Sequence, residues 1–200
     1  MRNRQRKSRD SGQSIIETLL TLPFLLTVLL NAVNFGYFYF VALHLAASPR
    51  AAVEYSIIGR STPAAISYAQ AGPISAALSV SHVAVQDLTG SIYAPSTNVA
   101  VQVCSMSNGI VGGGTANERA ACTTHGTVPA GYSFPAVQPD PELNPAGTPA
   151  FISNRVDVVY TFQPLIPGAP FNLALLASPA CNATNGVTCI MHRPAIMRAM

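Results

Sequence analysis

The sequence predicts an α+β protein: a single N-terminal transmembrane helix, then a small extracytoplasmic domain with a helix and an antiparallel sheet stabilised by disulfides. Three observations lead to this prediction. A long apolar run follows a short basic leader, two later segments alternate apolar and polar residues, and all four cysteines lie beyond the apolar run. About 140 residues follow the predicted anchor, enough for one small hydrophobic core, and a helix packed on a sheet buries one face of each.

Residues 1–12 form the basic leader. Five basic residues and one acid give it a net charge of +4, whereas six basic and six acidic residues balance from Pro49 onward. The basic character therefore belongs to the leader, and we expect no nucleic-acid partner. A basic cluster directly before a membrane segment predicts that the N-terminus stays in the cytoplasm.

The apolar run extends from Ile15 to Ala47, and Thr18–Val41 alone is long enough to span a bilayer, which takes about 20 helical residues. A secretory signal has an apolar region of only about 7–15 residues. Cleavage near Ala46–Ser48 by signal peptidase is therefore the disfavoured alternative. Aromatic residues at Tyr37–Phe40 suit the far membrane interface.

We predict helix over residues 13–58, interrupted at Pro23 and Pro49 because proline removes a backbone donor and clashes with the preceding turn. Three mid-span residues suit contact with protein rather than lipid, because small and polar residues mediate helix packing in membranes. These are Asn31, Asn34 and Gly36.

Residues 59–200 form the predicted α+β domain. A helix over 61–79, split at Gly72-Pro73, precedes the sheet. Patterns of β-branched and alternating residues predict strands. The strands are Ser81–Val85, Asn98–Val103 and Arg155–Phe162, the last two half-buried. Residues 192–200 are either a short helix or a last strand, and the Gly- and Pro-rich stretches 112–114 and 129–149 are loops.

The cysteines predict two disulfides in an oxidising compartment. Four cysteines allow three connectivities. We favour Cys104–Cys122 and Cys181–Cys189, because each pair encloses a loop rich in Gly, Asn and Thr. The closer Cys-x2-Cys spacing of a metal site does not occur, so no metal is expected.

The sequence indicates no catalytic residue, cofactor or small-molecule substrate. The histidines, His44, His82, His125 and His192, are scattered and suit surface or capping positions, and there is no Gly-x-Ser-x-Gly elbow. Asp157 is expected to face solvent from its strand. The glycines of 109–114 lack the lysine of a phosphate loop, and Asn182–Thr184 fits a glycosylation acceptor. A hydrolase would need a positioned nucleophile and base, so we predict that the protein is not an enzyme.

Glu17 is the one acid at the edge of the apolar run. A carboxylate in an apolar span costs about 2.5–3.5 kcal/mol even on lenient insertion scales, so it needs a role. One role is an ion pair with a neighbouring subunit that sets the register of assembly. The other is to stabilise the positive end of its own helix. The two roles are compatible.

Several stretches carry a family resemblance: Gly12–Glu17 (Gly-Gln-Ser-Ile-Ile-Glu), Leu22–Leu26 (Leu-Pro-Phe-Leu-Leu), Asn34–Tyr37 (Asn-Phe-Gly-Tyr), Ala51–Tyr55 (Ala-Ala-Val-Glu-Tyr) and Val156–Pro167, with its Pro-Leu-Ile-Pro turn. Together they resemble the TadE-like family, minor pseudopilins of the Tad (tight adherence, Flp-type) pilus. Thr18 stands where the major Flp pilin usually has tyrosine. That difference disfavours the major fibre subunit, which is also much shorter.

The resemblance implies a precursor that a prepilin peptidase cleaves between Gly12 and Gln13. It implies a single-pass protein of the bacterial inner membrane that acts with other pseudopilins and the Tad assembly platform in pilus biogenesis and adherence. Glu17 would then pair with the new amino terminus of a neighbour. The alternative is an uncleaved single-pass protein with a periplasmic binding domain.

Overall fold

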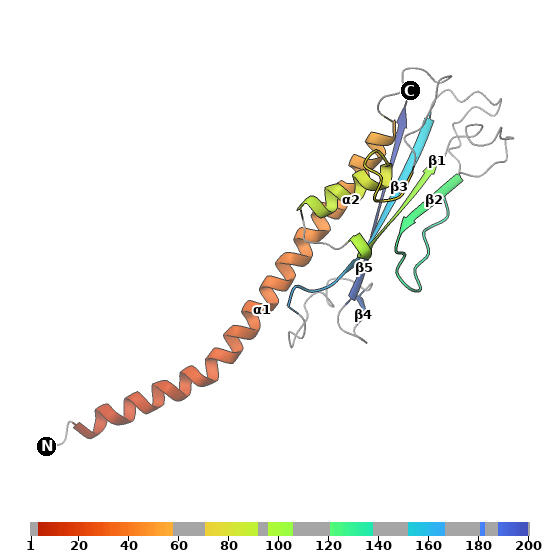
Figure 1. Cartoon of the computed structure of the whole chain (residues 1–200). Coiled ribbons are helices and arrows are strands. Elements are labelled where there is room, and N and C mark those ends of the chain that lie inside the picture. Colours follow the sequence, from red (N-terminus) through yellow and green to blue (C-terminus); the bar gives the residue numbers. More distant parts are fainter. Residues whose placement is uncertain are drawn as a thin grey trace. The chain divides into compact units, whose positions relative to one another are not determined.

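The computed structural model describes residues 4–57, 71–91, 96–105, 121–137, 152–166, 181–182 and 188–199 (Figure 1). Its elements are the helices α1 (Arg4–Ile57) and α2 (Val80–Ser91), the 3-10 turn η1 (Ser96–Asn98), and the strands β1 (Val99–Ser105), β2 (Ala121–Gly126), β3 (Ile152–Phe162), β4 (Cys181–Asn182) and β5 (Thr188–Ala199).

The chain divides into two compact units. The anchor unit combines Met1–Tyr39 with Gln163–Cys189, and the sheet unit combines Phe40–Phe162 with Ile190–Met200. Helix α1 and strand β5 each contribute residues to both units. The predicted order of a long apolar N-terminal helix followed by a small domain with a helix and an antiparallel sheet is present.

Helix α1 is longer than predicted at its start and is not interrupted. Its backbone is helical from Arg4, within the predicted leader, and it ends at Ile57, one residue from the predicted end. The predicted interruptions at Pro23 and Pro49 are wrong, because the helix continues through both. A proline removes only its own donor, and the Pro23 carbonyl remains bonded, accepting a hydrogen bond from the Thr27 hydroxyl at 2.8 Å.

The predictions for 71–85 are also wrong. Residues 71–79 form turns rather than the end of a helix, and Ser81–Val85 lies in α2 rather than in a strand. Ser79 caps the helix, because its hydroxyl accepts a hydrogen bond from the His82 backbone N–H at 3.0 Å. The core-facing residues of α2 follow helical spacing: Val80, Ala84, Val85 and Leu88. The part of the predicted helix at 61–70 lies outside the described residues.

The sheet has the strand order β2-β1-β3-β5-β4. Strand β1 pairs antiparallel with β2 and with β3, which confirms the strands predicted at 98–103 and 155–162. The sequence left a helix or a strand open for 192–200, and residues 192–199 belong to the strand β5. Strand β2 lies in a stretch that the sequence left irregular. Four strands belong to the sheet unit, and the short β4 pairs with the start of β5 in the anchor unit.

The two faces of the sheet are told apart by contacts from β3. The Asn154 side chain donates to the Ser56 hydroxyl on α1 at 3.0 Å, so even-numbered β3 residues face the helices. Val156, Val158 and Tyr160 are buried on that face. Asp157 and Val159, on the opposite face, are buried as well. Strand β3 is therefore central and covered on both faces, not half-buried as predicted.

Within the sheet unit, α1 contributes buried apolar side chains and a polar contact to α2. Val41, Leu45 and Val53 of α1 are buried. The buried Ser48 hydroxyl donates to the Ala84 carbonyl of α2 at 2.8 Å. Figure 1 shows α2 beside the C-terminal part of α1 on one side of the strands.

The disulfide Cys104–Cys122 is confirmed. The β1–β2 register places the two residues opposite each other, with 4.1 Å between their Cα atoms. Cys189 is buried and disulfide-bonded, and the β4–β5 register sets Cys181 opposite it. Because the Cys181 side chain lies outside the described residues, the second pairing stays a prediction.

Candidate functional site

Helix α1 is the one described helix long and apolar enough to cross a membrane. From Gln13 to Leu26 every residue is exposed, including Glu17 and the large apolar side chains of Ile15, Leu20 and Phe24. A soluble protein rarely exposes so large an apolar patch. The surface of this segment is therefore suited to lipid.

The threonine hydroxyls within the apolar segment donate hydrogen bonds to backbone carbonyls of the same helix. Thr18 donates to the Ser14 carbonyl and Thr21 to the Glu17 carbonyl, each at 2.9 Å. Bonds to the preceding turn let hydroxyls enter an apolar environment. The Glu17 carboxylate, in contrast, has no hydrogen-bond or ion-pair partner among the described residues.

The two asparagines predicted to face protein are buried, whereas Gly36 is exposed. The Asn34 amide makes two long-range bonds: its Nδ2 donates to the Ile166 carbonyl at 3.0 Å, and its Oδ1 accepts from the Ile166 N–H at 2.9 Å. Asn31 donates only to Thr27 of its own helix, at 2.8 Å, and its Oδ1 has no described partner. Asn34 thus ties the turn after β3 to α1.

A second cluster lies on the sheet face opposite the helices and is centred on Asp157. The Asp157 side chain is fully buried, and Arg155, two residues before it on the same face, donates to both of its oxygens at 2.7 Å. His192 Nε2, on the neighbouring strand β5, lies 2.7 Å from Asp157 Oδ1. The rings of Tyr132 and Phe134 lie with their centroids 6.0 and 6.3 Å from that of His192.

The electrostatics of the cluster favour the ionised carboxylate. Burial by itself raises the pKa of Asp157, but the hydrogen bonds from His192 and Arg155 and the charge of Arg155 outweigh it and lower the pKa below its ordinary value. Burial and the nearby Asp157 charge raise the pKa of Tyr132. Asp157 is therefore a charged, fully paired side chain inside the sheet unit.

The expectations that Asp157 faces solvent and that His192 is a surface or capping residue are wrong. The sequence carried a partial signal, because Arg155 and Asp157 share one strand face at a spacing of two. The pairing of β3 with β5 is not visible in the sequence. Although His and Asp are two members of a catalytic triad, no hydroxyl or thiol is bonded to the His192 ring in the described part of the chain. The cluster links β3 to β5 through the contact between Asp157 and His192.

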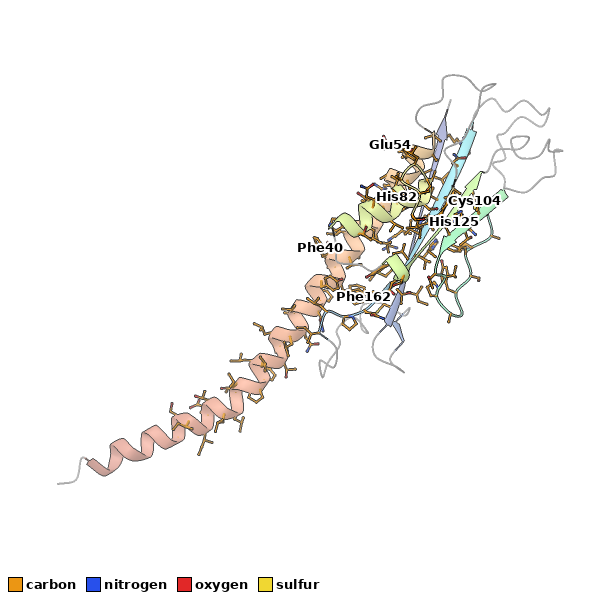
Figure 2. All side chains as sticks on the ribbon, in the orientation of Figure 1. Phe40, Glu54, His82, Cys104, His125 and Phe162 are labelled. Carbon is orange, nitrogen blue, oxygen red and sulfur yellow. A yellow bond between two sulfur atoms is a disulfide. The ribbon has the colours of Figure 1, made fainter. Side chains whose placement is uncertain are left out.

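An open cleft of about 610 Å³ separates α2 from the end of β2, and it is lined by His82, His125, Gln86 and three threonines, among others. The His82 Nδ1 lies 2.7 Å from the Ile74 carbonyl oxygen, to which it donates. Figure 2 labels both histidines. The described residues hold no group of three or more side chains that could ligate a metal ion.

The remaining predicted positions are not brought together. His44 contacts the Phe40 ring of its own helix, with centroids 4.4 Å apart. Gly12 and Gln13 lie in the continuous backbone of α1, and cleavage between them stays a prediction. The glycines of 109–114 and residues 183–184 of the glycosylation pattern lie outside the described residues.

No protein-family model, curated protein or solved structure matches this chain.

Proposed function

We propose that this chain is a membrane-anchored, pilin-like assembly subunit similar to the TadE-like minor pseudopilins of the Tad pilus. It has no catalytic activity of its own in this proposal. One observation carries it: helix α1 exposes its large apolar side chains from Ile15 to Leu29, and the same helix supplies buried residues of the sheet unit from Val41 to Val53. Such a helix serves both as membrane anchor and as part of the domain core.

Glu17 supports a role in assembly rather than anchoring alone. It lies in the first turns of the apolar segment, is exposed, and has no partner among the described residues. A carboxylate in an apolar environment is costly unless it is paired. Attraction between opposite charges is strong in low dielectric, so the new amino terminus of a neighbouring subunit is a suitable partner.

Cleavage after Gly12 is compatible with the helix. Glycine costs about 1 kcal/mol relative to alanine within a helix, so the backbone around Gly12 unwinds more easily than its neighbours. Removal of the leader shortens α1 to begin at Gln13. The inner membrane, a prepilin peptidase, other pseudopilins and the Tad assembly platform are the partners in this proposal.

The deciding experiment is mass spectrometry of the mature N-terminus, from host membranes with and without the prepilin peptidase. We expect a chain starting at Gln13 only when the peptidase is present. Gly12→Leu should block this maturation, and Ser11→Ala is the matched control. An intact leader in both strains would leave the alternative, an uncleaved single-pass protein. A start near Ser48 would indicate a secreted protein.

The role of Glu17 needs a separate measurement. Glu17→Ala should leave membrane insertion intact, measured by resistance to carbonate extraction, and should reduce assembly of surface pili. The neighbouring Thr18→Ala is the control, because its hydroxyl is bonded only within the helix. Normal piliation by Glu17→Ala would argue that Glu17 only stabilises the helix end.

A further inference from the structure

We infer that the turn Pro164–Ile166 lies in the outer interfacial layer of the membrane, and that Leu165 contacts lipid there. The inference rests on the proposed membrane anchor and adds a second protein–lipid contact to it. All of its residues belong to the anchor unit.

The depth follows from counting along α1. The hydrocarbon core is about 30 Å thick, which takes about 20 helical residues. Counted from Ile15, the first residue of the apolar run, the twentieth residue is Asn34. Tyr37 and the exposed Tyr39 follow within two turns, where aromatic side chains favour the interface. By this count Asn34 lies near the outer boundary of the hydrocarbon core, and not in mid-span as predicted from the sequence.

The turn is held at this depth by Asn34. One amide side chain satisfies both the N–H and the C=O of Ile166, at 2.9 and 3.0 Å, across a sequence separation of 132 residues. Asn34 itself is buried. The turn consequently shares the membrane level of Asn34.

The chemistry of the turn suits an interface. Backbone polar groups are costly in lipid unless they are bonded. Pro164 has no N–H, and both polar backbone groups of Ile166 are bonded to Asn34. Leu165 is 60% exposed. A single exposed leucine is ordinary on a soluble surface, but this one is fixed at the level where α1 exposes Val33 and Phe35.

The chain has no tryptophan, so a single introduced tryptophan reports on one position. The test uses the full chain in phosphatidylcholine–phosphatidylglycerol vesicles, with lipids brominated near the headgroup or near the chain ends. Leu165→Trp should lose roughly half of its fluorescence in the shallow brominated lipid and less in the deep one, since interfacial groups lie about 5–10 Å into the boundary. Leu78→Trp, at an 80% exposed position of the sheet unit, is the water-exposed control.

One further variant distinguishes failure of this inference from failure of the proposed membrane anchor. Leu25→Trp, in mid-span, should be quenched most by the deep bromines, and its failure to be quenched would overturn the proposed anchor itself. If Leu25→Trp is quenched while Leu165→Trp behaves like Leu78→Trp, the anchor stands and this inference is wrong. Emission from Leu165→Trp that is shifted to the blue but insensitive to both lipids would mean that protein covers the turn, which also overturns lipid contact.

The last part of the experiment tests whether Asn34 holds the turn Pro164–Ile166 at the membrane interface. Asn34→Leu removes both bonds to Ile166, and in this background Leu165→Trp should lose its shallow quenching. Asn31→Leu is the matched control one turn away, because Asn31 bonds only to its own helix. Equal quenching in the two backgrounds would contradict the role of Asn34.

Discussion

Replacing Asp157 tests whether the buried cluster stabilises the fold by linking β3 to β5. Asp157→Asn keeps the volume of the side chain, so it creates no cavity, but it removes the charge that faces Arg155 and His192. Three short contacts at 2.7 Å are weakened together. The amide of asparagine would also direct an N–H toward groups that are themselves donors.

The expected loss of unfolding free energy follows from how deeply the three side chains are buried. Removing one partner of a buried ion pair costs about 3–5 kcal/mol, because the remaining charge is left unpaired. The Arg155 and His192 side chains are 14% and 21% exposed, so water partly solvates them after the substitution. We therefore expect a loss near the lower limit, about 3 kcal/mol of unfolding free energy.

The assay is urea unfolding of the full, oxidised chain in detergent micelles. Near-ultraviolet circular dichroism follows the transition, because Tyr132 packs against His192. The control is Arg193→Gln at the exposed neighbouring position, which should change stability by less than about 0.5 kcal/mol. A loss below about 1 kcal/mol for Asp157→Asn, the value of an exposed pair, would refute the argument that the cluster is buried and coupled.

Three further predictions concern the sheet unit. The fold lowers the pKa of Asp157 from its ordinary 3.8. The free energy that the ionised Asp157 contributes to stability is therefore complete above this ordinary pKa and is lost as the pH falls through the lower pKa of the folded state. In that acid range the unfolding free energy of Asp157→Asn should change less with pH than that of the unsubstituted protein. Gly126→Ala should cost more than about 2 kcal/mol in urea unfolding, because φ is +94° and the new Cβ meets the β1 backbone; Gly131→Ala, at φ +76° with open space, should cost less. The disulfide between Cys104 and Cys122 closes a loop with a sequence separation of 18. Replacing both cysteines by serine should lower the unfolding free energy by about 3 kcal/mol, because the unfolded chain loses this restraint. An unchanged midpoint of urea unfolding would show that strand pairing alone restrains this loop.

Local sequence patterns were sufficient for the elements that depend on local physics. The apolar run predicted the membrane-length helix, period-two alternation predicted β1 and β3, and the loop compositions predicted the Cys104–Cys122 pair. The Ser81–Val85 prediction failed because a short apolar run suits a strand or a buried helix equally. The hydrogen bond from the His82 backbone N–H to the Ser79 hydroxyl caps a helix at this point, which favours α2 over a strand.

Only the tertiary structure decided which distant residues meet. Asn34 bonds Ile166 across 132 residues, and Asp157 meets His192 across 35. The two residues of each pair are too far apart in the sequence for local geometry to bring them together. Each contact depends on the packing of a distant strand or turn against its neighbour. The sequence by itself determined that a membrane-length helix precedes a disulfide-bonded sheet. The tertiary fold determined that β3 is buried on both faces, so that a charge expected in solvent becomes the centre of a paired cluster.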